Sequence, residues 1–308
     1  MPSVTLTDPQ RGLSPRRSSR RRFSAIMGAY LYLAPALLVI GIFVLFPAVD
    51  LFFLSLCKAS IIGRTRFIGF GNFVDLIASR DFLSSLKATA IFMVSVVLAQ
   101  TFIALVVAIL SESESRAMGL ARTVFFIPVV LPFVVTSYLW KFLYNPEFGL
   151  IGSILSWLGA PRQGFLADPS QALPSLIVSC IWKSWAFFMM IFLAGLKEIP
   201  RELYECAYLE GASSRQRVRY VTLPLLKRTI LFVVVVTTMD SVAKVFTPVL
   251  VMTDGGPRSA TDLLVYYIWR TAFRLGDIGY ASAVSVFMFA FVLAVSLVQL
   301  RVGREWDA

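Results

Sequence analysis

The sequence predicts an all-α membrane protein with six transmembrane helices and both termini in the cytoplasm. Of its 308 residues, 57% are hydrophobic and only 15% are charged, and the mean hydropathy is +0.76. A water-soluble protein of this length needs more charged side chains to cover its surface. Apolar stretches long enough to cross a bilayer recur along the chain.

Each crossing needs a helix of roughly 20 apolar residues, because hydrocarbon offers the backbone no hydrogen-bond partner. Four such stretches carry no charge at all, and two carry internal Lys or Asp. None shows the strict alternation of a membrane barrel strand. The prolines at 128 and 132 are expected to kink the third crossing. We expect spans at about 26–54, 86–110, 122–144, 172–196, 228–252 and 279–301.

The orientation follows from the loops, because cytoplasmic loops are enriched in Lys and Arg. With the N-terminus inside, the inner segments hold 17 of these residues and the outer segments hold 9. Residues 1–24 are predicted to be a disordered basic cytoplasmic tail, and residues 25–308 to form the membrane domain. The arginine cluster at 16–22 is typical of a topology signal against anionic lipid, so no nucleic-acid partner is expected.

Several kinds of site are excluded by composition. The chain has no histidine, which rules out His-based catalytic triads, metal sites and proton relays. The cysteines Cys57, Cys180 and Cys206 are scattered, without metal-ligand spacing. We therefore expect no catalytic residue and no metal site in this chain.

Segment 200–224, between the fourth and fifth spans, carries ordered helix signals. Pro200 suits a first helical turn, Gly211 a helix end and Ser213 the cap of a second helix, which ends or kinks near Pro224. These residues predict a cytoplasmic helix–turn–helix, with Glu205, Tyr208 and Leu209 on one face. The plainer alternative is an amphipathic connector in the headgroup layer.

The pattern Glu205-Cys206-Ala207, then Gly211, then Val221-x-Leu223-Pro224 resembles the EAA loop of bacterial ABC importer permeases. Cys206 replaces the usual first alanine of that motif. The stretches 67–73, 145–149 and 252–257 resemble the carbohydrate-uptake branch, which includes maltose-type and glycerol-3-phosphate-type transporters. The likeness extends over nearly all of 28–300.

This resemblance implies a multi-pass protein of the bacterial inner membrane with several partners. The protein partners are a second homologous permease, with which the chain forms a heterodimer, two copies of a cytoplasmic ABC ATPase, and an extracytoplasmic solute-binding protein. The chain is also expected to contact membrane lipid. The chain lacks a phosphate-binding G-x-x-x-x-G-K-[ST] motif, so ATP and Mg are expected on the ATPase. Coupling to the ATPase is assigned by the resemblance to Glu205, Cys206, Ala207, Tyr208, Leu209, Gly211, Ala212, Leu223 and Pro224.

Three charges lie well inside predicted spans, away from their ends: Lys183, Asp240 and Lys244. A charge at the bilayer centre costs on the order of 2.5–3.5 kcal/mol on insertion scales, so such groups face a polar path or a partner. Alternatively, Lys183 pairs with Asp240 or bonds backbone carbonyls, and Asp240 pairs with Lys244 at i, i+4. When this sequence is aligned with the maltose-type permease, the positions that contact sugar in that permease give the candidates for the solute path. They are Lys183, Ser184, Phe187, Thr237, Asp240, Ser241 and Lys244.

The expected function is import of a sugar or sugar-like solute by alternating access. Because two lysines outnumber one aspartate, an anionic solute is a further hypothesis. An ion-coupled secondary transporter working without an ATPase, with Asp240 as its cation site, is the alternative. An intramembrane enzyme would need a second carboxylate, and Asp50 alone remains, near the end of another span.

Overall fold

The computed structural model describes residues 30, 32–61, 63–112 and 115–305. The predicted basic tail 1–24 lies outside this range. The chain divides into two compact units at Leu51–Phe52, and each is described by itself. Helical structure dominates both units.

The first unit holds most of the first span, which is helical over Tyr32–Ser55. It includes a π-helical turn, η1 (Gly41–Leu45), followed by α2 (Phe46–Ser55). The span has the length and hydropathy of a membrane crossing, as predicted for 26–54.

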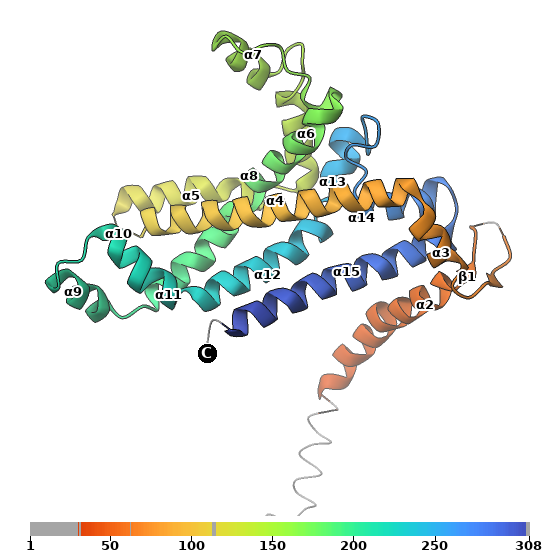
Figure 1. The fold of residues 1–308 in the computed structure, drawn as a ribbon, viewed down its shortest axis with the longest axis horizontal. Helices are drawn as coiled ribbons and strands as arrows, with labels where there is room; N and C mark the ends of the chain where they lie inside the picture. The colour runs from red at the N-terminus through yellow and green to blue at the C-terminus, as the bar shows by residue number, and fades with distance from the viewer. Residues whose placement is uncertain (1–29, 31, 62, 113–114, 306–308) are drawn as a thin grey trace, which may run out of the picture. The chain divides into compact units, whose positions relative to one another are not determined.

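Four long helical segments form the bundle of the second unit: α4 (Arg80–Leu110), α8 (Pro169–Lys197), Lys227–Thr253 and α15 (Ile278–Glu305). The third comprises α12 (Lys227–Ala243), α13 (Phe246–Pro248) and η4 (Val249–Thr253). Figure 1 shows α4, α12 and α15 running side by side, and α8 packs against α4 and α12. These four segments have the length and hydropathy of membrane crossings and coincide with four of the predicted spans, with ends that differ by up to six residues.

The N-terminal end of α4 shows why one boundary moved. The helix begins at Arg80, six residues before the predicted start, because Ser79 caps it: its hydroxyl accepts a hydrogen bond from the amide of Phe82 at 3.2 Å. Asp81 adds a negative charge in the first turn, where the helix dipole favours it. Polar and charged residues thus extend the helix beyond its apolar stretch.

The third span, predicted as one kinked helix over 122–144, is instead broken. Helices α5 (Arg116–Val130) and α6 (Phe133–Leu143) meet at 98°. Leu131 is extended, with φ −67° and ψ 143°, as expected for a residue before proline. The break is therefore at Pro132, whereas Pro128 is accommodated inside α5.

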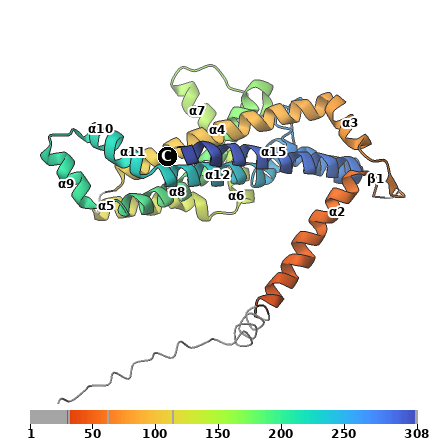
Figure 2. The same cartoon turned by 60° about the horizontal axis from the view of Figure 1, so that its bottom comes forward.

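Short elements gather at one end of the bundle (Figure 2). The strands β1 (Cys57–Lys58) and β2 (Arg66–Phe67) pair antiparallel beside α3 (Gly71–Ala78). The side-chain amide of Asn72 donates to the carbonyls of Ser55 and Cys57, both at 2.8 Å. Further along the chain, the connections contain α7 (Leu150–Trp157), the 3₁₀ turn η2 (Phe165–Ala167), α14 (Leu264–Trp269) and η5 (Arg270–Arg274).

The opposite end carries the segment between α8 and α12 (Figure 1). It contains α9 (Arg201–Leu209), α10 (Ser214–Arg217), the π-helical turn η3 (Val218–Thr222) and α11 (Leu223–Leu225). The apolar core beneath this end is built from buried side chains of α4, α8 and α12, among them Ala104, Phe188, Phe192, Leu196, Leu226 and Val233.

Candidate functional site

The segment after α8 forms a helical hairpin, which we call the α9–α10 hairpin (residues 201–217). Gly211 ends α9 in the left-handed region, with φ +80°. The amide of Ala212 donates to the carbonyl of Ala207 at 2.9 Å, which closes the helix end. Ser213 and Gln216 form a reciprocal capping box at the start of α10. The helix–turn–helix predicted at 200–224 has the expected geometry.

One face of the hairpin is exposed and apolar. Tyr208 and Leu209 are 69% and 84% exposed, respectively. Together with Tyr204, Glu205 and Arg217 they line a shallow hollow between α9 and α10. The Arg217 guanidinium lies 5.8 Å from the centre of the Tyr208 ring. Exposed apolar side chains rimmed by charge are typical of a surface that binds another protein.

The hairpin is tied to both neighbouring spans. The hydroxyl groups of Tyr204 and Thr222 lie 3.0 Å apart, which holds α9 against η3. A β-carbon at Gly195 of α8 would lie 2.9 Å from Oγ1 of Thr229 and 3.0 Å from Cδ2 of Leu226. The backbone of α8 at Gly195 therefore packs directly against the side chains of Leu226 and Thr229, near the points where the hairpin leaves α8 and rejoins α12.

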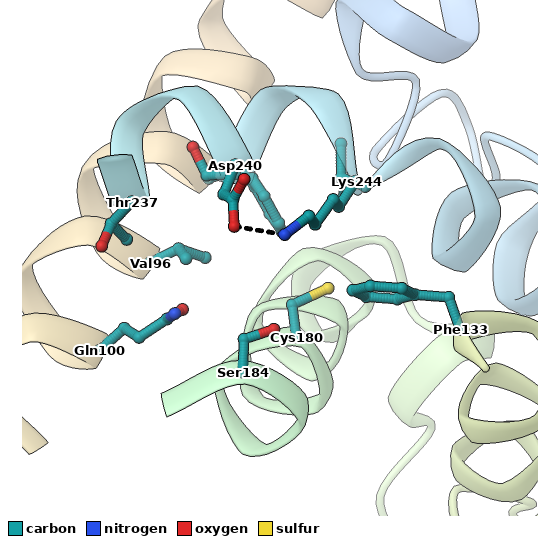
Figure 3. Close-up of a pocket in the computed structure, with 11 residues that line it drawn as sticks. Val96, Gln100, Phe133, Cys180, Ser184, Thr237, Asp240 and Lys244 are labelled. Atoms are coloured by element: carbon teal, nitrogen blue, oxygen red, sulfur yellow. Dashed lines mark hydrogen bonds and ion pairs between the residues drawn. The ribbon is translucent and has the colours of Figure 1, made fainter. Parts of the chain in front are cut away.

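A polar hollow lies among α4, α6, α8 and α12, about 30 Å³ in volume. Figure 3 shows side chains from all four helices converging on it. Five of the seven predicted solute-path residues line this hollow: Ser184, Thr237, Asp240, Ser241 and Lys244. The space open to water in this hollow is too small for a sugar in this arrangement.

Six lining residues were not predicted: Phe92, Val96, Gln100, Phe133, Cys180 and Val245. Gln100 had a usable signal, because a carboxamide in an otherwise apolar span needs a polar neighbour or cavity. Phe133 and Cys180 had none, since apolar residues fill every span. Their roles depend on the break in the third span and on the rotation of α8.

Asp240 and Lys244 form an ion pair at 2.5 Å, one helical turn apart (Figure 3). The i, i+4 pairing is thus confirmed. Lys244 is also the residue at which α12 ends. Beside this pair, Ser241 donates to the carbonyl of Thr238 at 2.8 Å. The buried Oγ1 of Thr237 has no hydrogen-bond partner within the described part of the chain. The hollow thus offers a hydroxyl, a carboxylate and an ammonium group to a solute.

Lys183 does not join this hollow. Its ammonium donates to the carbonyl of Val129 at 2.9 Å and lies 4.8 Å from the centre of the Phe133 ring. The residue is 5% exposed. Of the alternatives for Lys183, the bond to a backbone carbonyl is the one that the structure forms.

Phe187 also lies elsewhere. It is partly exposed and lines an apolar groove between α5 and α8, away from the hollow. Neighbours in this groove include Gly119, Thr123 and Phe126 of α5. One turn along α8 separates Ser184 from Phe187, and the helix turns the ring towards α5. The expected stacking of Phe187 on a sugar in the hollow is not supported by this position.

At the other end of the bundle, the turn after η4 is held by Asp254. The carboxylate accepts two hydrogen bonds from Arg274, at 2.8 and 3.0 Å, and one from the Tyr266 hydroxyl at 2.9 Å. Hydrogen bonding from Arg274 lowers the pKa of Asp254 below its ordinary value. Gly255 has φ +80°, and a β-carbon there would lie 2.6 Å from the Tyr266 ring. The turn at Gly255-Gly256-Pro257 is therefore held in place by hydrogen bonds and by close packing against Tyr266.

Asp262 lies just beyond this turn and is 3% exposed. It accepts a hydrogen bond from Arg270 at 2.7 Å. Burial nevertheless raises the pKa of Asp262 to about 6, although the Arg270 charge opposes the shift. This carboxyl group therefore titrates near neutral pH.

Residues 100–307 match the family described as "Binding-protein-dependent transport system inner membrane component". The matched region includes α5 through α15, and so the hairpin and three of the four helices around the hollow. The chain belongs to this family of transport permeases.

Related permeases have been named for sugars and for a phosphorylated polyol. The permease is 32% identical over 288 residues to the trehalose/maltose transport system permease protein MalF of Thermococcus litoralis, covering 93% of this chain and 97% of that protein. It is 31% identical over 277 residues to the sn-glycerol-3-phosphate transport system permease protein UgpA of Agrobacterium fabrum, covering 88% and 93%. The resemblance found in the sequence to importer permeases of the carbohydrate branch is confirmed.

Among solved structures, the permease shares its fold with a chain of the bacterial alginate ABC transporter in complex with alginate pentasaccharide-bound periplasmic protein. The TM-score is 0.83 at 24% identity, covering 92% of the permease and 96% of that chain. Five helices are long and apolar enough to cross a membrane, or six if the broken third span is counted. The permease is a multi-pass inner-membrane protein, as predicted.

Proposed function

We propose that the permease imports a sugar or sugar-like solute by alternating access, driven by a separate ABC ATPase. The observation that carries this proposal is the α9–α10 hairpin, which is exposed on its own face and connects α8 to α12, two helices that pack closely at Gly195. Both of those helices also line the polar hollow. The names of relatives that transport trehalose, maltose or glycerol-3-phosphate support this class of solute.

The proposed topology places both termini and the hairpin in the cytoplasm. The distribution of Lys and Arg favours it. The C-terminal end of α15 lies at the same end of the bundle as α9 (Figures 1 and 2), which agrees with this orientation. In the proposed assembly, the hairpin meets one of two ATPase copies, and the opposite end faces a solute-binding protein.

We assign the contact with the ATPase to the exposed face of the hairpin. Leu209 and Tyr208 supply apolar area, and Glu205 and Arg217 flank them with opposite charges. Cys206, Ala207 and Ala212 are small enough for close approach, while Leu223 and Pro224 begin the return to α12. Closure of the ATPases would push the hairpin and tilt α8 and α12 together, because the two helices share the close contact at Gly195.

The solute path proposed for this chain is the hollow lined by Ser184, Thr237, Asp240, Ser241 and Lys244. Hydroxyl and carboxylate groups bind sugar hydroxyls. Among the described residues of the hollow, the one ammonium is paired with the one carboxylate. Lys183 does not line this hollow, so the surplus of lysine that motivated an anionic solute is not found among its lining residues. A second, homologous permease would complete the cavity.

The decisive experiment compares uptake by the reconstituted transporter carrying Leu209→Asp with uptake by the unaltered complex. Placing a charge on the exposed apolar face should lower uptake at least tenfold, while solute affinity of the binding protein is unchanged. Glu210→Gln is the matched control, because Glu210 lies just outside the shallow hollow between α9 and α10. This variant should transport normally. Uptake that continues without any ATPase would refute the proposal and support the ion-coupled alternative.

A further inference from the structure

Lys183 is a cation in the middle of an apolar helix, yet it faces neither the solute hollow nor Asp240. Its ammonium lies against the break of the third span, 2.9 Å from the Val129 carbonyl and 4.8 Å from the centre of the Phe133 ring. These two residues stand on opposite sides of Leu131 and Pro132. One side chain therefore contacts both halves of the broken span.

The break creates the need for such a group. In an unbroken helix, the amide of Phe133 would donate to the carbonyl of Val129. The turn at Pro132 separates them and leaves that carbonyl in the last turn of α5 without its helical partner. An unsatisfied carbonyl in hydrocarbon costs several kcal/mol. Since the C-terminal end of a helix is also the negative end of its dipole, a buried ammonium is favoured there.

Phe133 is the first residue of α6, and it borders two hollows. One is the polar hollow with Asp240 and Lys244. The other is smaller and is lined by Lys183 itself and by further side chains of α6, α8 and the end of the fifth span, including Ser137, Trp140, Ser179 and Met252. Phe133 and Cys180 line both, and Figure 3 shows the Phe133 ring beside the Cys180 sulfur. The ring thus stands where the two hollows adjoin.

We propose that Lys183 is a positioning residue that holds the path closed. By binding the end of α5 and the face of Phe133 at once, it keeps the ring between the two hollows. Movement of α8 with the hairpin withdraws the ammonium from Val129, and α6 then swings the ring aside. The idea that this contact is released during transport rests on the proposed function. The contact of Lys183 with Val129 and Phe133 does not depend on it. Lys183 is accordingly not a solute ligand.

The native thiol of Cys180 reports on this closure, because it lies at the junction of the hollows. In the assembled transporter carrying Cys57→Ala and Cys206→Ala, Cys180 is the remaining cysteine of this chain. A membrane-impermeant methanethiosulfonate, added from the side of the solute-binding protein, should label it slowly. Lys183→Met, which keeps the length but loses the charge, should raise the labelling rate at least tenfold. Lys183→Arg should restore slow labelling.

Lys141→Met is the matched control. Its ammonium also donates to a backbone carbonyl, that of Val251 at 3.0 Å, but it does not touch the break. Labelling should stay within twofold of the parent. Phe133→Leu tests the same idea with the Lys183 bond intact and should also speed labelling, which keeps the test open if Lys183→Met does not assemble.

Uptake kinetics separate positioning from solute binding. Lys183→Met should lower the maximal uptake rate while the half-saturating solute concentration stays within threefold. Unchanged Cys180 labelling in both Lys183→Met and Phe133→Leu would overturn the proposal. A half-saturating concentration raised tenfold by Lys183→Met would also overturn it, by making Lys183 a solute ligand. Labelling needs no ATP, so its result stands even if the ATPase-driven function fails.

Discussion

Gly195 of α8 and Thr229 of α12 are so close that a β-carbon on the glycine would lie 2.9 Å from the threonine Oγ1. The contact stands where the two helices enter and leave the α9–α10 hairpin. A side chain here would have to push the helices apart. Because Gly195 packs directly against the Thr229 side chain, we expect the two flanking helices to move together.

Gly195→Leu should therefore damage both stability and coupling. Overpacking of this kind costs typically 1–3 kcal/mol, so we expect a lower midpoint of thermal unfolding in detergent and reduced uptake. Gly119→Leu is the control, because a β-carbon at Gly119 would meet nothing within 4 Å. Equal losses in both variants would show that the contact at Gly195 is not the cause.

The ion pair between Asp240 and Lys244 should behave as a unit. Asp240→Asn or Lys244→Met alone leaves a charge without its partner at membrane depth, so each should lower uptake more than fivefold. The double variant should recover part of that loss, because no lone charge remains. A double-mutant cycle of uptake rates measures the coupling; strictly additive effects would show that the pair is not functionally coupled.

Gly211 tests whether the shape of the hairpin matters apart from its side chains. Its positive φ is strained for a β-branched residue, and space for a β-carbon is open. Gly211→Val should reduce uptake at least tenfold, whereas Gly211→Asn, which adopts the left-handed region more readily, should retain a substantial part. ATPase co-purification with each variant, compared with thermal stability, distinguishes lost docking from misfolding.

Asp262 predicts a pH effect on stability. Its folded pKa of about 6 lies above the ordinary value of 3.8, so the folded state holds a proton that the unfolded state has released. This group therefore favours folding more at pH 5 than at pH 7, by an amount on the order of 1 kcal/mol. Asp262→Asn should abolish that difference in thermal midpoint, after correction for the remaining pH dependence. A parallel pH profile in the variant would contradict the prediction.

The sequence was sufficient for the spans and the hairpin because both depend on local signals. Apolar stretches as long as those in α4 and α15 form helices in a membrane regardless of their neighbours. Gly211 and Ser213 carry their own turn and cap chemistry, so the hairpin followed from a few residues. Ser79, a cap outside the apolar stretch, shifted one boundary.

The site was harder to predict, because it depends on how helices are rotated and bent. Prolines at 128 and 132 both indicated a kink, but only packing decides that the chain turns by 98° at the second. Lys183 then bonds the carbonyl that this turn exposes. Phe187 shows the effect of the rotation of α8 about its axis. It lies one turn from Ser184, but its ring lies in the groove between α5 and α8 instead of in the polar hollow.

Asn72 makes a large contribution to the structure at the end of the bundle that carries β1, β2 and α3. A ladder of two residues per strand is too short to persist by itself, and the amide of Asn72 fastens the chain on both sides of Leu56. Rotation of that one side chain would release two carbonyls at once, so fraying of the β1–β2 ribbon should begin there, before any helix loosens.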